Sequence, residues 1–333
     1  MAPKLVFLSG AELNAYLELE RRWRYPGRKE SHHRALQQEL MSMDWGRRAW
    51  RIAALKDRRG TVAAAVSLHD LNYRLNARRL TLCGLSSLAV AGRFRRLGLG
   101  RLLLEAVHDY LRESEYDGTL AFSTIGARYF GRLGYQPLPL ASLEADLEGW
   151  RSSGPQVDGE STVRAYRPDD PADFEAVRNL YNTTSSLQEL AVLRDEAYWR
   201  FVLRRSELEA QAIPGERRAF LVGEREGRIV SYMHAGVTGR SGRLNVYEYG
   251  VESGAAEDMT VLSRAVIESL GRRRRPRRLR CVVPTRFRNW CPARKTAWRV
   301  EKRNVLMMLP LSGFAVPAEI AQDERLIWNL DRF

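Results

Sequence analysis

The sequence has few cysteines and no long apolar run. Three cysteines stand far apart in 333 residues, at Cys83, Cys281 and Cys291, and their odd number and spacing argue against a disulfide framework or a zinc site. The longest apolar runs, such as residues 62–66, are too short to span a membrane, and the N-terminal residues do not form a signal-peptide pattern. We therefore expect a cytoplasmic protein with no metal and no membrane partner.

Lysine is scarce as well, since it supplies five of the 54 basic residues and arginine supplies the others. Against 40 acidic residues this gives a formal net charge of +14, an excess that is compatible with a polyanionic partner such as nucleic acid. The densest basic run, residues 272–278, lies between an expected helix and an expected strand, where such runs are usually solvated. We therefore expect no specific nucleic-acid binding.

Length and composition favour two domains. A chain of 333 residues exceeds one typical domain, and a hydrophobic content of 44% is enough for packed cores. Residues 143–161 include a stretch rich in glycine and serine, which predicts a linker. We expect domains at residues 1–145 and 162–314, with the linker proper at 146–161 and a C-terminal tail at 315–333.

Hydrophobic periodicity predicts a similar order of elements in both halves. In the first half we expect helices at 11–24 and 30–43, strands at 50–55, 61–71 and 80–90, a helix at 98–113, a strand at 119–123, a short helix from 127 and a final strand after it. In the second half we expect a strand at 162–166, helices at 172–181 and 194–204, strands at 219–222, 228–237 and 244–251, a helix at 259–270 and strands at 279–283 and 304–311.

The turn between the strand at 80–90 and the helix at 98–113 is the most informative segment. It contains Gly98 and Gly100, and arginines flank the two glycines. The first N–H groups of a helix lack partners within the helix, and the helix dipole favours negative charge there. Since glycine has no Cβ, a pyrophosphate can approach the backbone closely. The turn therefore predicts an anion-binding site.

Two motifs in this region resemble those of the GNAT N-acetyltransferase family. Residues 95–100, RRLGLG, fit R/Q-x-x-G-x-G/A, the acyl-CoA fingerprint of the family. Residues 127–135, ARYFGRLGY, resemble the A-x-x-F-Y-x-K-x-G-F element that follows the fifth strand of these domains. The resemblance covers residues 50–139 and implies an α/β (α+β) fold, in which a mixed, mostly antiparallel twisted sheet is flanked by helices.

The second half resembles a second, diverged GNAT domain, which would make this a tandem GNAT chain. Its counterpart of the pyrophosphate turn lacks the R-x-x-G-x-G pattern and carries Glu252, Glu257 and Asp258, which would repel a pyrophosphate. We therefore expect this half to be non-catalytic, and an unrelated α/β domain is the alternative. The fingerprint in the first domain resembles the Eis (enhanced intracellular survival) type, although this sequence departs from that type by lacking its third domain.

The resemblance implies acetyl-CoA as the co-substrate and an amine as the acceptor. The pantetheine arm would lie along the strand backbone, and the turn with the start of the helix would hold the pyrophosphate. The cofactor-binding residues that the resemblance implies are Leu88, Ala89, Val90, Arg95, Arg96, Gly98, Leu99, Gly100, Arg101 and Phe130.

The residue that would protonate the leaving thiolate departs from the family pattern. The family's tyrosine falls at Phe130, which has no proton to donate, while the adjacent Tyr129 points about 100° away on a helix. Tyr129 is one candidate acid, and unassisted departure is the other, because a thiol pKa of roughly 8.5 makes the thiolate a tolerable leaving group. We expect Phe130 to face the cofactor and therefore expect unassisted departure.

The sequence also leaves more than one candidate for the base that would take the proton of the amine. Where many GNAT domains carry a carboxylate, this chain has Ser86 and Ser87, so the nearest candidates are His69 and Asp70 on the preceding strand. The alternative, which we favour, is that these two residues mark an exposed strand end without a catalytic role. Eis-type enzymes use a terminal carboxylate as the base, and the tail that ends at Phe333 is a further candidate.

The sequence thus predicts an acetyl-CoA-dependent N-acetyltransferase with its active site in the first domain. One alternative is a catalytically weak acyl-CoA-binding or regulatory protein, which Phe130 suggests. Another is an acetyltransferase directed at protein or RNA, which the net charge of +14 suggests. The identity of the acceptor and the oligomeric state, a homo-oligomer included, stay open.

The arginine excess predicts only weak, sequence-independent binding to RNA or DNA. Because phosphate contacts release counterions, the affinity should fall steeply as the salt concentration rises. A salt titration with a fluorescent oligonucleotide measures this dependence. A tight complex that survives physiological salt, and that is lost when the arginines of residues 272–278 are replaced, would contradict the prediction.

Overall fold

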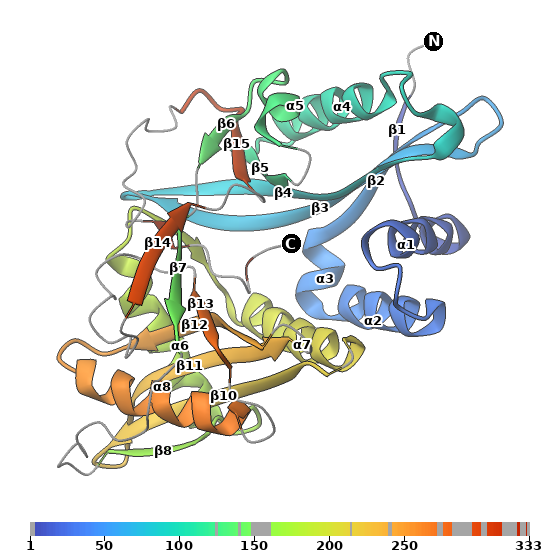
Figure 1. The fold of residues 1–333 in the computed structure, drawn as a ribbon. Coiled ribbons are helices and arrows are strands. Elements are labelled where there is room, and N and C mark those ends of the chain that lie inside the picture. Colours follow the sequence, from blue (N-terminus) through green and yellow to red (C-terminus); the bar gives the residue numbers. More distant parts are fainter. Residues whose placement is uncertain are drawn as a thin grey trace.

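Two β-sheets form the core of the molecule, and helices pack on their faces (Figure 1). The computed structural model describes residues 4–123, 126–138, 141–147, 161–213, 215–238, 242–271, 276–281, 295–300, 305–314, 325–326 and 331. In this part of the chain, no helix is long and apolar enough to cross a membrane.

The first sheet is mixed and mostly antiparallel. Its strands follow the order β1 (Leu5–Phe7), β2 (Trp50–Lys56), β3 (Val62–Leu75), β4 (Arg78–Val90), β5 (Gly118–Ser123), β15 (Val305–Pro310) and β6 (Gln136–Leu138). β4 and β5 pair in parallel, and the other neighbours in this order are antiparallel. At the far end of β3, β9 (Leu190–Leu193) pairs antiparallel with β3, and β16 (Arg325–Leu326) pairs in parallel with β9.

The second sheet repeats this plan. Its strands follow the order β14 (Lys295–Val300), β7 (Ala141–Asp146), β13 (Arg278–Cys281), β12 (Arg243–Val251), β11 (Arg228–Thr238), β10 (Arg217–Arg225) and β8 (Thr162–Ala165). Here β12 and β13 form the parallel pair, as β4 and β5 do in the first sheet. The two sheets therefore have corresponding points at which parallel strands can separate.

The helices of the first half cover both faces of its sheet. α1 (Gly10–Arg24), α2 (Glu30–Ser42) and α3 (Asp44–Ala49) lie on one face, and α4 (Leu99–Glu113) and α5 (Ala127–Gly131) lie on the other (Figure 1). The second half adds α6 (Pro171–Ser186), α7 (Glu196–Ala212) and α8 (Ala256–Gly271). Of these, α7 packs against α2 and α3, so a helix of the second half joins the first.

The apolar stripe of α4 places this helix against the first sheet. Leu103, Leu104, Val107 and Leu111 recur at helical spacing and are fully buried in a cluster with residues of β2, β3 and β4. This burial fixes the helix axis, and with it the position of the α4 N-terminus beside the end of β4.

Each sheet contains strands from the other half of the chain. β15 comes from the second half, yet it inserts between β5 and β6, so that Met308 pairs with both Leu120 and Gln136. β7 comes from the first half, yet it lies between β13 and β14 of the second sheet (Figure 1). At these strands the sheets do not follow the expected ranges 1–145 and 162–314. The second range contributes β9 and β15 to the first sheet, and the first range contributes β7 to the second sheet.

The sequence predicted the longer elements of both halves in the observed order, and it missed several short ones. The unpredicted elements include β1, α3, β7, β9, β14 and β16. The first residues of the glycine- and serine-rich stretch also differ from expectation, since they end β7 with Leu143 and Ala145 buried. Most of the expected linker, residues 148–160, lies outside the described residues.

A buried arginine joins the two sheets. Arg194 follows β9, and its guanidinium donates to Glu248 on β12 (Nη1 to Oε1, 3.0 Å) and to Asp331 (Nε to Oδ1, 2.9 Å). The guanidinium lies 4.2 Å from the ring centre of Tyr181 and 4.3 Å from that of Trp199. The three charged side chains are buried, so removal of one would leave its partners unpaired in the interior.

Met307→Ala should destabilise the first sheet, although Met307 belongs to the second half by sequence. Its side chain is fully buried on β15 in the core under α4, so the cavity should cost about 2–5 kcal/mol of unfolding free energy. Chemical denaturation measures this loss, and hydrogen exchange should become faster in β5 and β6. Leu187→Ala, at an exposed position, is the control. Unchanged exchange in β5 and β6 would contradict the assigned strand order.

Candidate active site

β4 and β5 separate before β4 ends. Their parallel pairing runs from Leu82 opposite Gly118 to Leu85 opposite Ala121, and no further β4–β5 pair occurs among the described residues. β4 nevertheless continues to Val90, paired on its other side with β3. The edge of β4 beyond Leu85 therefore has backbone groups that β5 does not cover.

A β-bulge at Ser87 shapes this part of β4. Ala65 of β3 pairs with Ala89, while Ser67 pairs with Ser86, so β4 has one residue more than β3 in this interval. Ser87 itself has a left-handed φ of 52°. The bulge interrupts the alternation of side chains, and both serine hydroxyls make contacts on the face of the sheet that α1 covers.

α1 holds the bulge through two residues one helical turn apart. The Tyr16 hydroxyl donates to the carbonyl of Ser87 at 3.0 Å. The Ser87 hydroxyl in turn donates to Glu20, whose second carboxylate oxygen is 3.4 Å from Nε2 of His33. Glu20 is only 6% exposed and His33 only 1%. A buried carboxylate therefore lies directly against the bulge.

The turn before α4 presents an uncapped helix N-terminus. Gly98 is the N-cap residue with a left-handed φ of 78°, and no side chain caps the helix. Arg95 and Arg96 are exposed beside the turn, whereas Arg101 pairs with Glu105 on the same helix at 2.7 Å. N–H groups at a helix start, close to basic side chains, suit the binding of an anion such as a pyrophosphate.

Tyr129 reaches toward the start of α4. Its hydroxyl lies 3.1 Å from the position that a Cβ on Gly100 would occupy, and Cγ2 of Val90 lies 3.5 Å from the same position. Partial burial, together with the charge of Glu105, raises the pKa of the Tyr129 phenol. The phenol is therefore protonated at neutral pH and can donate a hydrogen bond at this place.

Phe130 points into the core instead. It is 5% exposed and packs under α4, edge-to-face against Tyr135 with 5.1 Å between the ring centres. Adjacent helical residues diverge, and the more apolar ring takes the buried direction. Of the two residues, Tyr129 is therefore the one on the side of Gly100.

The remaining residues that the resemblance implies lie together at this end of the sheet. Leu88, Ala89 and Val90 form the part of β4 beyond the bulge, and Leu99 is the first residue of α4. The strand end, the turn and Tyr129 thus form one continuous region.

His69 and Asp70 point to opposite faces of β3, because successive strand residues alternate. His69 is buried, and its Nε2 lies 2.9 Å from Oγ of Ser86 beside the bulge. Asp70 accepts from Nη2 of Arg51 at 2.6 Å, and Arg51 also donates to Tyr110 of α4. Burial raises the pKa of Asp70 on that face. The structure therefore brings His69 to the bulge and does not bring Asp70 there.

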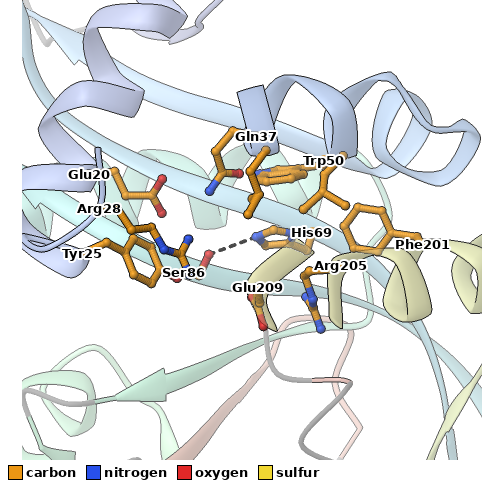
Figure 2. A pocket seen from close by; sticks show the side chains of 12 residues that line it. Glu20, Tyr25, Arg28, Gln37, Trp50, His69, Ser86, Phe201, Arg205 and Glu209 are labelled. Atoms are coloured by element: carbon orange, nitrogen blue, oxygen red, sulfur yellow. Dashed lines mark hydrogen bonds between the residues drawn. The ribbon is translucent and has the colours of Figure 1, made fainter. Parts of the chain in front are cut away.

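A small pocket lies behind the bulge, between α1, α2, the central strands and α7. Its volume is about 60 Å³, and Figure 2 shows the side chains that surround it. The lining residues are Glu20, Tyr25, Arg28, Leu36, Gln37, Leu40, Trp50, His69, Ser86, Phe201, Arg205 and Glu209. Of the ionisable residues among them, only His69 could be named as a candidate from the sequence.

The corresponding turn of the second half is filled by the chain's own side chains. Gly254, with a left-handed φ of 82°, precedes α8 as Gly98 precedes α4. In the first turn of α8, Asp258 is 2% exposed, accepts from Oγ of Ser161 at 2.7 Å and pairs with Arg225. A pyrophosphate placed here would meet a buried carboxylate, which supports the prediction that this half has no CoA site.

A sheet that opens between two parallel strands, next to a glycine turn and an uncapped helix, is the arrangement of the acyl-CoA-dependent transferases that the sequence resembles. Residues 13–135 match the model of the acetyltransferase (GNAT) family. The N-terminal part of the chain is therefore a GNAT acetyltransferase domain.

Solved structures of the same fold cover nearly the whole chain. A probable N-acyltransferase from Enterococcus faecalis V583 is 11% identical, with a TM-score of 0.69 over 93% of this chain and 73% of that one. Eis1 from Mycobacterium abscessus is 13% identical, with a TM-score of 0.59 over 92% and 73%. A tandem GNAT protein from the clavulanic acid biosynthesis pathway is 15% identical, with a TM-score of 0.52 over 94% and 99%. No curated protein matches the sequence.

These likenesses establish the fold, which is a mixed α/β arrangement with two GNAT-like halves. Among the residues that the structure describes, no group of three or more His, Cys, Asp or Glu side chains could hold a metal ion. The described ranges exclude Cys291, residues 272–275 of the basic run and most of the expected tail 315–333, with Phe333 among them.

Gly98→Glu should lower the affinity for CoA by about tenfold or more, because it strains a left-handed position and places a carboxylate where the pyrophosphate would bind. Isothermal titration calorimetry measures the affinity and should give one CoA per chain for the unchanged protein. Asp258→Asn, in the second half, is the matched control and should bind normally. Unchanged affinity in a folded Gly98→Glu variant, or two CoA molecules per chain, would contradict this assignment.

Proposed function

We propose that the chain transfers an acetyl group from acetyl-CoA to a primary amine, with the active site in its N-terminal domain. The observation that carries this proposal is the bulge at Ser87. On one side of it the uncovered edge of β4 leads to the α4 turn, and on the other side it adjoins a pocket with buried ionisable groups. A junction of this kind lets two bound molecules meet in a fixed orientation.

The residues present fit acetyl-CoA, which supplies the acetyl group as a thioester. The first N–H groups of α4, together with Arg95 and Arg96, would hold the pyrophosphate. The backbone of β4 beyond Leu85 would bind the amides of the pantetheine arm. Gly100 keeps clear the space in front of Tyr129, since a Cβ there would lie 3.1 Å from the phenol oxygen.

The amine would be received in the pocket behind the bulge. Glu20, which accepts a hydrogen bond from Ser87, would stabilise the arriving ammonium group. His69, which contacts Ser86, would take the proton that the amine loses. The neutral amine then attacks the acetyl carbon, the C–N bond forms as the C–S bond breaks, and backbone N–H groups at the bulge polarise the carbonyl oxygen.

Tyr129 would donate its proton to the departing sulfur, so that the products are the N-acetylated amine and the CoA thiol. Its position beside Gly100 and its raised phenol pKa support this role, because they keep a proton on the cofactor side of α5. The same position weighs against a catalytically weak binding protein, since that alternative depended on Phe130 in place of a donor.

Tyr129→Phe should lower kcat by roughly 10²-fold, since it removes the proton donor and keeps the ring. A thiol-release assay measures kcat and the KM for acetyl-CoA. Phe130→Tyr is the paired variant, and it should lower the thermal stability without raising the rate, because its hydroxyl enters the core. A nearly unchanged kcat in Tyr129→Phe would mean that the thiolate leaves unassisted. A raised KM at constant kcat would assign Tyr129 to cofactor binding alone.

A further inference from the structure

We propose that the amine acceptor also carries a carboxylate, so that its class is an amino acid or a small derivative with both groups. This inference rests on the proposed function and specifies the acceptor of the same site. Three features of the pocket behind the Ser87 bulge carry it. They are a buried carboxylate, a guanidinium held in the wall, and two buried polar atoms without partners.

The carboxylate that would receive the ammonium group is Glu20. It is 6% exposed and lies between the hydroxyl of Ser87 and the ring of His33. Charges interact more strongly where water is excluded, so an ammonium group next to Glu20 would be held close to the bulge. This is the place from which the amine must reach the acetyl carbon.

The guanidinium that would receive the carboxylate is Arg28. It lies over the ring of Tyr25, 4.0 Å from the ring centre. Two hydrogen bonds hold the backbone of Arg28 in place. One runs from Arg28 N to Tyr25 O (2.9 Å) and the other from Arg21 Nη1 to Arg28 O (2.8 Å). No carboxylate among the described residues pairs with Arg28, and Figure 2 shows its side chain directed toward Ser86 and His69. Arg28 is therefore positioned to bind an anionic group of a ligand.

Two buried side chains of the pocket have polar atoms without a hydrogen-bond partner in the described part of the chain. They are Oε1 of Gln37 and Nε1 of Trp50, in residues that are 6% and 8% exposed. The first atom can only accept and the second can only donate, and a buried group that stays unpaired costs free energy. An ammonium group can donate to Gln37 and a carboxylate can accept from Trp50, so one zwitterionic ligand offers both partners.

The charges of the pocket distinguish this class from a polycation. Arg28 and Arg205 line it together with Glu20 and Glu209. A polyamine would bring its second positive charge close to a guanidinium. A zwitterion would place its ammonium group near a glutamate of the pocket and its carboxylate near an arginine. A volume of about 60 Å³ admits the head of a small molecule, which favours a compact acceptor.

α7 brings the second half of the chain into acceptor recognition. It supplies Phe201, Arg205 and Glu209 to the wall of the pocket. Arg204 of the same helix donates to Glu39 of α2 at 2.6 Å, which holds α7 against the first half. The second half would therefore contribute to the choice of acceptor without taking part in the chemical step.

The experiment compares each standard amino acid with its carboxamide and with its decarboxylated amine, using the full chain and acetyl-CoA in a thiol-release assay. At least one amino acid should be acetylated with a kcat/KM about tenfold or more above both of its carboxylate-free counterparts. Arg28→Gln should then raise the KM for that amino acid by about tenfold or more and leave the KM for its carboxamide nearly unchanged.

Two further variants separate recognition from structural support. Arg28→Lys keeps the positive charge and should retain part of the preference for the carboxylate. Arg22→Gln is the matched control on α1, where the arginine side chain is 68% exposed and pairs with Glu18, and it should leave both KM values unchanged. If Arg28→Gln raises the KM for the acid and for the carboxamide equally, Arg28 only supports the local structure and the inference is overturned.

Calorimetry on the CoA-loaded chain distinguishes failure of the inference from failure of the proposed function. If the chain binds CoA and no amino acid binds or reacts at millimolar concentration, the inference is overturned, whatever other amines do. If the chain neither binds CoA nor releases thiol with any acceptor, the proposed function is overturned, and the inference falls with it.

Discussion

The buried guanidinium of Arg194 determines how the two halves of the molecule meet. It is neutralised by Glu248 of the second sheet and by Asp331, in a place where an unpaired charge would be costly. The next residue, Asp195, caps α7 by accepting from the backbone N–H of Tyr198 at 2.7 Å. The position of Arg194 therefore fixes where α7 begins, and α7 forms one wall of the pocket behind the bulge. One interior charge thus connects the packing of the two sheets with the shape of this pocket.

The bulge at Ser87 determines the arrangement of side chains around β4, as Arg194 determines the packing of the two halves. One extra residue in β4 turns two neighbouring hydroxyls toward the same face, where Glu20 and His69 contact them. On its other side, the same strand is free of β5 beyond Leu85 and leads to the turn at Gly98. The cofactor region and the pocket are therefore not independent features, because both depend on how a single strand departs from regular pairing.

Local patterns predicted much of the fold and the turn before α4, and tertiary contacts decided the rest. The α4 helix follows from its apolar periodicity, and the glycine at position 98 follows from a turn that needs a left-handed residue. Whether Tyr129 or Phe130 faces the cofactor could not be predicted from an alignment, because the answer depends on the packing of one ring against Tyr135. Glu20 has no local signal at all, since its place in the site arises from contact with Ser87, 67 positions away.

The strand exchange has a consequence for how the protein is made. β5 and β6 leave the ribosome early, but β15, the strand that lies between them, is synthesised only after most of the second half. Until then both strands expose unpaired edges, which are the parts of a nascent chain that pair wrongly or aggregate. Contacts between such distant segments also slow folding, because a long loop must close before they form. The GNAT domain, although encoded first, is thus completed last, because its sheet lacks an interior strand until the second half has been synthesised.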